Sequence, residues 1–223
     1  MFDTVIVSGG NIQKDFALCF LEKEIEESGR ENLTLIAADR GLEFFMETGL
    51  KPDIAVGDFD SLSSEGKEYI KSHPQLRVQR LKPEKDDSDT QSAMNLAIAM
   101  GASCILILGC FGTRLDHVMA NIELMVPAEK AGVKLVLMDR HNYMTLAFDG
   151  MVLERDSRFG KYVSFFPLGT EVTGLTLTGF KYPLEHYTLT AADCGLTVSN
   201  EILEDTAEVH FDGGRLLMIM SED

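Results

Sequence analysis

The sequence predicts an α/β domain followed by an all-β domain, and three observations support this. Up to about residue 140, short β-rich apolar runs alternate with stretches in which apolar residues recur three or four positions apart. After about residue 142 the helical period disappears, and β-rich segments separated by Gly, Pro and Asp replace it. The chain has 223 residues, 45% of them hydrophobic, which is enough for a sizeable core. We expect domains at 1–142 and 143–223.

The strands expected in the first domain are nearly continuous in apolar residues. Such runs are typical of a mostly parallel sheet that helices cover on both faces, a three-layer, Rossmann-like arrangement. The expected strands are 4–7, 33–37, 54–56, 76–81, 104–108 and 134–138. The expected helices are 15–28, 41–48, 89–100 and 116–131, each followed by a glycine that can end it. Pro127 is expected to kink or shorten the last of these helices.

The second domain is expected to be a small antiparallel β-sandwich. Its strand-like segments are short, and turn-forming residues separate them at close intervals. The expected strands are 143–148, 162–166, 174–177, 196–199, 207–211 and 216–220.

Composition and charge exclude several classes of protein. A net charge of −16 without clustered Lys and Arg argues against nucleic-acid binding. The longest apolar runs have the length of strands, and the N-terminus lacks a basic region followed by a hydrophobic one, so neither membrane insertion nor secretion is expected. The four cysteines are scattered and form no CxxC pair, which argues against zinc and disulfides and favours the cytoplasm.

Acidic residues gather where the predicted strands end. In an open parallel sheet this edge collects ligands, and Asp39, Asp58 and Asp60 follow strands there. If GDFD at 57–60 is extended, Asp58 and Asp60 face one side while Phe59 points into the core. Oxygen ligands without nearby His or Cys favour Mg²⁺. The alternative is an ordinary turn, because Asp, Ser and Gly commonly form turns.

A second acidic segment, KDDSDTQ at 85–91, opens a predicted helix. Asp and Ser cap helices and complement the N-terminal dipole, so a single such residue needs no further reason. The carboxylates of Asp86, Asp87 and Asp89 exceed what capping requires. They are candidate metal ligands, with Lys85 facing a phosphate group.

A glycine-bearing loop, GCFGTRLDH at 109–117, joins a buried strand to a helix. Its backbone N–H groups can face phosphate, and Arg114 can bind phosphate oxygens bidentately. It is not a Walker A loop, which would read GxxxxGK followed by Ser or Thr. His117 can orient Asp116 or a phosphate, or can serve helix packing.

Five segments together resemble the thiamine pyrophosphokinase family, also called thiamine diphosphokinase. They are AADRG at 37–41, PDIAVGDFDS at 52–61, KDDSDT at 85–90, GCFGTRLDH at 109–117 and GLTVSN at 195–200. The resemblance implies an ATP-dependent enzyme that transfers pyrophosphate to the hydroxyl of thiamine, giving AMP and thiamine diphosphate. It also implies a homodimer, with thiamine held between the α/β domain of one subunit and the β domain of the other.

The resemblance assigns roles to particular residues. Asp58, Asp60 and Asp89 match the magnesium-binding aspartates. Ser199 and Asn200 match a Ser-Asn pair near the thiamine pyrimidine. The residues that match ATP-side or catalytic loops are Asp39, Asp86, Arg114, Asp116 and His117. The chain departs from the family at Thr113, where glycine is common, at Cys110, and in having no Trp to stack on thiamine.

The residue types also fit pyrophosphate transfer when the family resemblance is set aside. Attack at the β-phosphorus needs positioning and charge neutralisation, which Mg²⁺ held by aspartates, Lys85 and Arg114 can supply. Either Asp86 or Asp116 is expected to accept the hydroxyl proton. An acidic cleft also favours the cationic thiazolium ring. The alternatives are a related nucleotide-dependent transferase acting on another hydroxyl compound, and a thiamine- or nucleotide-binding protein without turnover.

Overall fold

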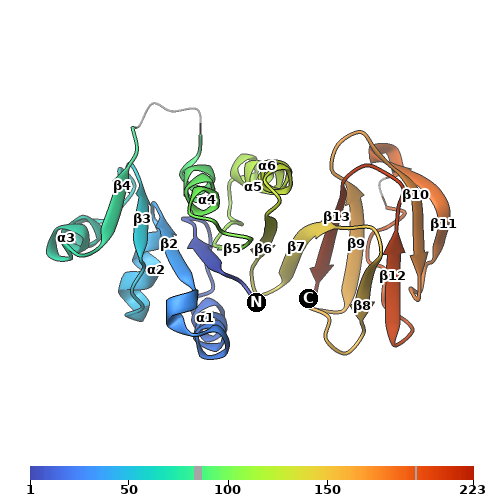
Figure 1. The fold of residues 1–223 in the computed structure, drawn as a ribbon, viewed down its shortest axis with the longest axis horizontal. Helices are drawn as coiled ribbons and strands as arrows, with labels where there is room; N and C mark the ends of the chain where they lie inside the picture. Colours follow the sequence, from blue (N-terminus) through green and yellow to red (C-terminus); the bar gives the residue numbers. More distant parts are fainter. Residues whose placement is uncertain (83–86, 194) are drawn as a thin grey trace. The chain divides into compact units, whose positions relative to one another are not determined.

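The computed structural model describes residues 1–82, 87–193 and 195–223, and the chain divides into two compact units (Figure 1). Met1–Arg140 combines helices with a parallel sheet, and His141–Asp223 is antiparallel β structure. The predicted fold class is therefore confirmed. Among the described residues, no helix has both the length and the apolar character that crossing a bilayer requires.

The sheet of the first unit has the strand order β4-β3-β2-β1-β5-β6, and every neighbouring pair is parallel. Its strands are β1 (Thr4–Val7), β2 (Thr34–Ala38), β3 (Ile54–Gly57), β4 (Arg77–Arg80), β5 (Cys104–Leu108) and β6 (Lys134–Met138). The interior strands are buried almost along their whole length because helices cover both faces. The outermost strand β4 exposes Arg77 and Arg80, and such charges discourage pairing with another chain.

The helices of the first unit alternate with its strands. They are α1 (Lys14–Ser28), α2 (Gly41–Thr48), α3 (Ser64–Ser72), α4 (Asp89–Ala99), α5 (Leu115–Glu123) and α6 (Met125–Lys130). The predicted helix 116–131 is divided in two after Glu123, and Pro127 lies in the first turn of α6, where its missing N–H costs nothing. We did not predict α3, which is short and polar. The sequence feature that marks the start of α3 is Ser63, whose hydroxyl accepts a 3.1 Å hydrogen bond from the Gly66 N–H.

Two antiparallel sheets form the second unit. One contains the strand order β7-β13-β9, and the other has the order β11-β10-β12-β8. The strands are β7 (Asn142–Ala147), β8 (Met151–Glu154), β9 (Tyr162–Pro167), β10 (Glu171–Thr178), β11 (Leu184–Thr190), β12 (Thr206–His210) and β13 (Leu216–Ser221).

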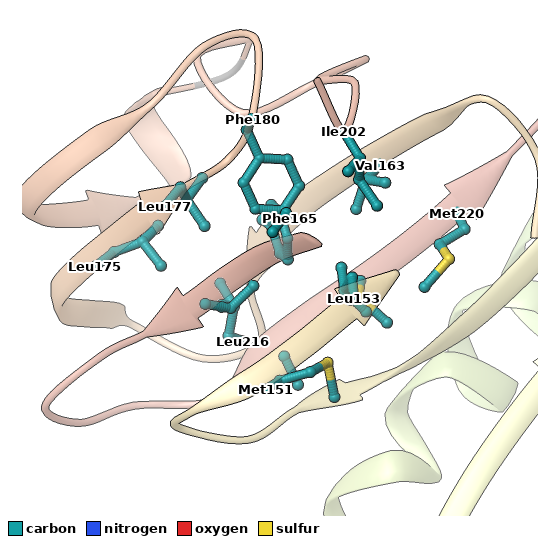
Figure 2. Packing of buried hydrophobic residues seen from close by; sticks show 14 of the residues in the cluster. Met151, Leu153, Val163, Phe165, Leu175, Leu177, Phe180, Ile202, Leu216 and Met220 are labelled. Carbon is teal, nitrogen blue, oxygen red and sulfur yellow. The ribbon is translucent and has the colours of Figure 1, made fainter. Parts of the chain in front are cut away.

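Side chains from both sheets meet in one apolar core, so the second unit is a sandwich (Figure 2). Phe165 on β9 and Leu216 on β13 come from one sheet, and Leu175 on β10 comes from the other; none of the three is exposed to solvent. The ring of Phe180, which follows β10, packs edge-on against Phe165 with centroids 5.7 Å apart. Burying large apolar side chains at this density is the main stabilising term of the unit.

In the second unit one predicted strand is wrong and two strands were not predicted. The segment 196–199 is a run of turns, because Ser199 has a left-handed φ of 57° and only Asn200 forms an isolated bridge, with Val163. We did not predict β8, a short strand. Nor did we predict β11, whose pairing with β10 is interrupted by register shifts and in which Leu189 alone is fully buried. A strand with little burial has weak apolar alternation, which is the signal that sequence reasoning uses.

A matched pair of glycines tests how tightly the turn after β10 is packed. Gly179 and Gly150 have similar left-handed φ values of 76° and 79°. A Cβ at Gly179 would lie 2.3 Å from the carbonyl oxygen of Thr206, whereas one at Gly150 would come no closer than 3.9 Å to His210. We expect Gly150→Ala to lower the free energy of unfolding by roughly 1–2 kcal/mol. Gly179→Ala should lower it by about 2–5 kcal/mol, because overpacking is added.

Urea unfolding of the two alanine variants and the wild type measures the difference. Equal losses in the two variants would show that the backbone of Thr206 does not restrict Gly179.

Candidate functional site

A cleft of about 510 Å³ lies at the carboxyl ends of the parallel strands of the first unit. Loops that follow β1, β2, β3 and β5 line it, together with the start of α4 and part of α5. The sequence-predicted residues that line it are Asp39, Asp58, Asp87, Asp89, Arg114 and His117. The topology of the sheet therefore brings together side chains that are up to 78 positions apart in the sequence.

Three carboxylates form a compact group beside this cleft. Asp39, Asp58 and Asp60 each offer one oxygen atom, and these atoms all lie within 4.8 Å of one another. Among the described residues, no other group of His, Cys, Asp and Glu side chains meets that spacing. Oxygen-only ligands of this kind suit a hard divalent cation such as Mg²⁺.

The backbone around Asp39 holds its carboxylate in this group. Asp39 follows β2 with a left-handed φ of 46°, and its N–H donates a 2.8 Å hydrogen bond to the Val56 carbonyl of β3. A Cβ at Gly57 would lie 3.1 Å from the Asp39 Cα atom, so glycine lets the two strand ends approach. The space at Gly57 thus admits Asp39. An unfavourable backbone conformation at a non-glycine residue is typical of functional sites.

Asp58 and Asp60 converge by a different geometry from the one predicted. The segment is not extended, because Phe59 has a left-handed φ of 61°. Phe59 is nonetheless only 2% exposed, as expected, and so anchors the turn in the core. The Asp60 N–H donates a 3.1 Å hydrogen bond to Oδ1 of Asp58. The turn presents both carboxylates toward Asp39.

The carboxylate of Asp39 is only half satisfied. Its Oδ2 accepts a short hydrogen bond from the Ser61 hydroxyl, but its Oδ1 is buried without any hydrogen-bond partner. Burial raises the pKa of Asp39 against the opposing effect of Ser61, and the negative charges of Asp89 and Asp58 raise it further. A cation beside Oδ1 would relieve both the charge repulsion and the missing contact. The residues present therefore fit a divalent metal ion.

Asp89 reaches the same neighbourhood from α4. It is the first residue of that helix and lines the cleft, and its charge acts on Asp39. The helix start is already capped by Ser88, whose hydroxyl accepts a 3.1 Å bond from the Gln91 N–H. Asp89 is thus not needed as the cap. Among the described residues, the compact group of carboxylates contains Asp39 beside Asp58 and Asp60, whereas the family resemblance implies Asp89 as the third ligand.

Arg114 and Asp116 form an exposed ion pair at the loop after β5. Arg114 Nη2 donates a 2.6 Å bond to Oδ2 of Asp116, and Nε donates a 3.2 Å bond to Oδ1. The Arg114 guanidinium lowers the pKa of Asp116 to about 2, and the His117 N–H bond to Oδ1 adds to this effect. Hydrogen bonding to Asp116 likewise raises the pKa of Arg114. At neutral pH Asp116 is therefore ionised and a weak proton acceptor.

Glycine and asparagine shape the backbone of this loop. Gly10 donates its N–H to the Gly109 carbonyl at 2.9 Å, and a Cβ at Gly10 would lie 2.4 Å from that same oxygen. Buried Asn121 on α5 donates a 2.7 Å bond from Nδ2 to the Cys110 carbonyl. Burial raises the pKa of the Cys110 thiol to about 12, so this residue supplies no nucleophilic thiolate.

Sequence reasoning missed several of these supporting residues. Ser61, which bonds to Asp39, stands within the quoted DFDS segment, and Asn121 is a single amide among the apolar residues Val118, Met119, Ala120 and Ile122. Arg40 follows Asp39 directly and also lines the cleft. Lys85 and Asp86, two of the predicted site residues, lie outside the described residues.

Ser199 and Asn200 belong to the second unit and differ in accessibility. Asn200 is 2% exposed, and its side-chain amide pairs with the backbone of Tyr182. Nδ2 donates to the Tyr182 carbonyl at 2.8 Å, and Oδ1 accepts from the Tyr182 N–H at 2.9 Å. Ser199 is exposed, and its N–H donates to the Ser164 hydroxyl. Ser199 can therefore reach a ligand, whereas Asn200 is engaged within the fold.

Both units match descriptions of known protein families. Residues 26–137 match "Thiamin pyrophosphokinase, catalytic domain", and residues 151–216 match "Thiamin pyrophosphokinase, vitamin B1 binding domain". The thiamine pyrophosphokinase of Bacillus subtilis (strain 168) is 35% identical over 197 residues, covering 86% of this chain and 89% of that protein.

Solved structures show the same similarity. The crystal structure of a thiamine pyrophosphokinase from Bacillus subtilis has a TM-score of 0.83 and 30% identity, covering 99% of both chains. That of a thiamin pyrophosphokinase from Geobacillus thermodenitrificans has a TM-score of 0.81 and 32% identity, covering 99% of this chain and 97% of that one. With its site geometry and with both family descriptions matched, the chain belongs to the thiamine pyrophosphokinase family, whose members are kinase-type transferases.

Proposed function

We propose that this chain transfers pyrophosphate from ATP to the hydroxyl group of thiamine, giving thiamine diphosphate and AMP. The observation that carries the proposal is the Asp39–Asp58–Asp60 group, with its unpartnered buried oxygen, at the ligand-collecting edge of the sheet. Membership of the thiamine pyrophosphokinase family supplies the substrates. The proposed partners are thiamine and ATP.

Asp39, Asp58, Asp60 and Asp89 are the residues that would hold Mg²⁺. When bound, the ion neutralises phosphate charge and fixes the orientation of the triphosphate. Asp39 is included because it lies within 4.8 Å of Asp58 and Asp60, and Asp89 because its charge acts on Asp39 and it lines the same cleft. Coordination of this kind would compensate for the burial of the Asp39 carboxylate and for its repulsion by Asp89 and Asp58, which together raise its pKa.

The phosphate groups of ATP are proposed to lie along the loops after β1 and β5. Arg114 and His117 line this part of the cleft, and the start of α4 adds a positive dipole end. Arg114 offers a planar fork that suits two phosphate oxygens, with Lys85 as a second cation. Binding there would require Arg114 to exchange some of its hydrogen bonds to Asp116 for bonds to phosphate.

In the reaction the thiamine hydroxyl oxygen attacks the β-phosphorus. The bond from that phosphorus to the oxygen bridging the α- and β-phosphates breaks, and AMP leaves. Asp86 or Asp116 takes the hydroxyl proton. The Arg114 ion pair, which lowers the Asp116 pKa to about 2, makes Asp116 the weaker base as long as the pair is intact. If Arg114 turns to phosphate, the pKa of Asp116 rises toward its ordinary value and its basicity increases.

Thiamine is proposed to contact the second unit at Ser199, with Asn200 holding the neighbouring backbone. We further propose a homodimer in which thiamine lies between the α/β unit of one subunit and the β unit of the other, as the family resemblance implies. The net charge of −16 favours the cationic thiazolium ring. We also propose a cytoplasmic location, on the ground that the cysteines are scattered in the sequence and form no CxxC pair.

The first test is product formation. We expect purified protein to convert ATP and thiamine to AMP and thiamine diphosphate in the presence of Mg²⁺, and to stop when EDTA removes the metal. Chromatography of nucleotides and thiamine esters measures both products. Formation of ADP and thiamine monophosphate would contradict the proposal, and turnover only with another hydroxyl compound would favour a related transferase.

Replacing a single carboxylate tests the proposed metal site. Asp60→Asn keeps the side-chain shape but removes a ligand charge, so we expect activity to fall about a hundredfold or more. The control is Glu27→Gln, which also replaces a carboxylate by an amide. Glu27 lies at the exposed end of α1, where its carboxylate is 3.7 Å from the Lys23 ammonium group. Initial rates over a range of Mg²⁺ concentrations measure the effect. Unchanged rates for Asp60→Asn would remove that residue from the metal site.

Asp39→Asn is expected to stabilise the metal-free protein while reducing its activity by about a hundredfold or more. Folding raises the pKa of Asp39. The protonated Asp39 carboxyl therefore stabilises the fold at pH values below its ordinary pKa, and this contribution is lost as the pH rises through the raised pKa. Asparagine carries no buried charge, and its carbonyl can still accept the Ser61 hydrogen bond. With EDTA present, the variant should therefore have the larger free energy of unfolding at pH 7.

The difference should shrink as the pH is lowered through the raised pKa of Asp39, where the wild-type carboxyl gains its proton. Urea unfolding of both proteins across this pH range measures it. A wild type that is as stable as the variant at pH 7 would contradict the assigned burial of the Asp39 charge.

A further inference from the structure

A buried pair of hydroxyl groups connects two walls of the cleft. The Ser8 Oγ and Thr90 Oγ1 atoms lie 2.6 Å apart and share a hydrogen bond, although the residues are 82 positions apart. Ser8 is 9% exposed and Thr90 is 7% exposed. A direct bond between two buried side chains that distant in sequence fixes tertiary geometry, and losing one partner leaves the other unsatisfied.

The formation of α4 does not require this bond. Ser88 already caps the helix, and its backbone carbonyl accepts from the Ser92 N–H at 2.9 Å. The Thr90 hydroxyl points instead to the loop after β1, so its bond holds the helix start against another part of the fold. Adjacent residues project from a helix about 100° apart. Fixing Thr90 inward therefore also fixes the direction in which Asp89 points.

Ser8 is held in turn by the last residue of β5 and by the loop that follows it. The Ser8 N–H donates a 2.8 Å bond to the Leu108 carbonyl, and a Cβ at Gly109 would lie 2.5 Å from the Ser8 carbonyl oxygen. The next residues continue the contact through the bond from the Gly10 N–H to the Gly109 carbonyl. Ser8 thus joins α4 on one side to the phosphate-facing loops on the other.

We infer that Ser8 and Thr90 are positioning residues, whose shared hydrogen bond fixes the position of Asp89 relative to the loops after β1 and β5. The inference rests on the proposed function, because it assumes that these walls hold the two ends of one ligand, a metal-bound triphosphate. Neither hydroxyl contacts a reacting atom in this account. Their effect is on how well the site is formed before the ligand arrives.

The test is the affinity for a complex of Mg²⁺ with α,β-methylene-ATP, which lacks the bridging oxygen and is not cleaved. Titration calorimetry should give a Kd about tenfold weaker for Thr90→Val than for the wild type, which corresponds to about 1.4 kcal/mol. Thr90→Ser keeps the hydroxyl and should stay within about twofold of the wild type. Ser8→Ala should match Thr90→Val, and the double variant should be no weaker than either single one, because all three lack the same bond.

Thr4→Val is the matched control. Thr4 is 4% exposed at the start of β1, the strand that Ser8 follows, and it does not line the cleft. We expect this variant to lower the melting temperature but to bind the analogue as the wild type does. Thr90→Val could lower the melting temperature only as much as Thr4→Val does and bind the analogue with unchanged affinity. The Ser8–Thr90 hydrogen bond would then serve stability alone, and the inference would fail.

Three other outcomes bear on this inference or on the proposed reaction. Equal weakening by Thr90→Ser and Thr90→Val would show that the hydroxyl is not what matters, and would also overturn the inference. A wild type that binds the analogue but forms no AMP from ATP and thiamine would overturn the proposed reaction alone. A wild type that does not bind the analogue would overturn both.

Discussion

Asp39 is fixed by its own backbone in a place where its carboxylate loses water without gaining a full set of hydrogen bonds. Its N–H is bonded to β3, the missing side chain of Gly57 lets the strand ends approach, and Oδ1 is left buried and unpartnered. Asp58 and Asp60 add charge within 4.8 Å. An arrangement that opposes folding in this way is retained where a ligand supplies the compensation, which is why we read it as a cation site.

The surrounding elements keep these carboxylates from relaxing apart. Phe59 is buried between Asp58 and Asp60, so the turn cannot rotate without exposing an aromatic ring. The hydroxyl pair of Ser8 and Thr90 holds the start of α4 in place, and Asn121 holds the loop after β5 through the Cys110 carbonyl. Rigid strands and buried polar bonds thus support a site whose own charges repel. In the second unit, the Asn200 side chain is likewise hydrogen-bonded within the fold, whereas the neighbouring Ser199 is exposed.

Much of the fold followed from apolar periodicity. Strands β1, β5 and β6 and helix α2 were predicted with the bounds that the structure has, because their residues are buried in a regular pattern. The elements that were missed, α3, β8 and β11, are short, polar or half-exposed, and periodicity is weak where burial is weak. The strand predicted at 196–199 was wrong. Apolar residues alternate with polar ones there, but the segment is a run of turns in which Ser199 has a left-handed φ.

The sequence by itself determined the division into an α/β and a β part, and it identified the acidic segments that follow the strands. Chain order and composition carry that information, because strand ends and turn residues are local properties. Only the tertiary structure decided which carboxylates approach one another. Asp39 joins Asp58 and Asp60 because β2 and β3 are neighbours in the sheet and because Phe59 adopts a left-handed turn. Such contacts depend on packing between segments far apart in the chain, and no local pattern encodes them.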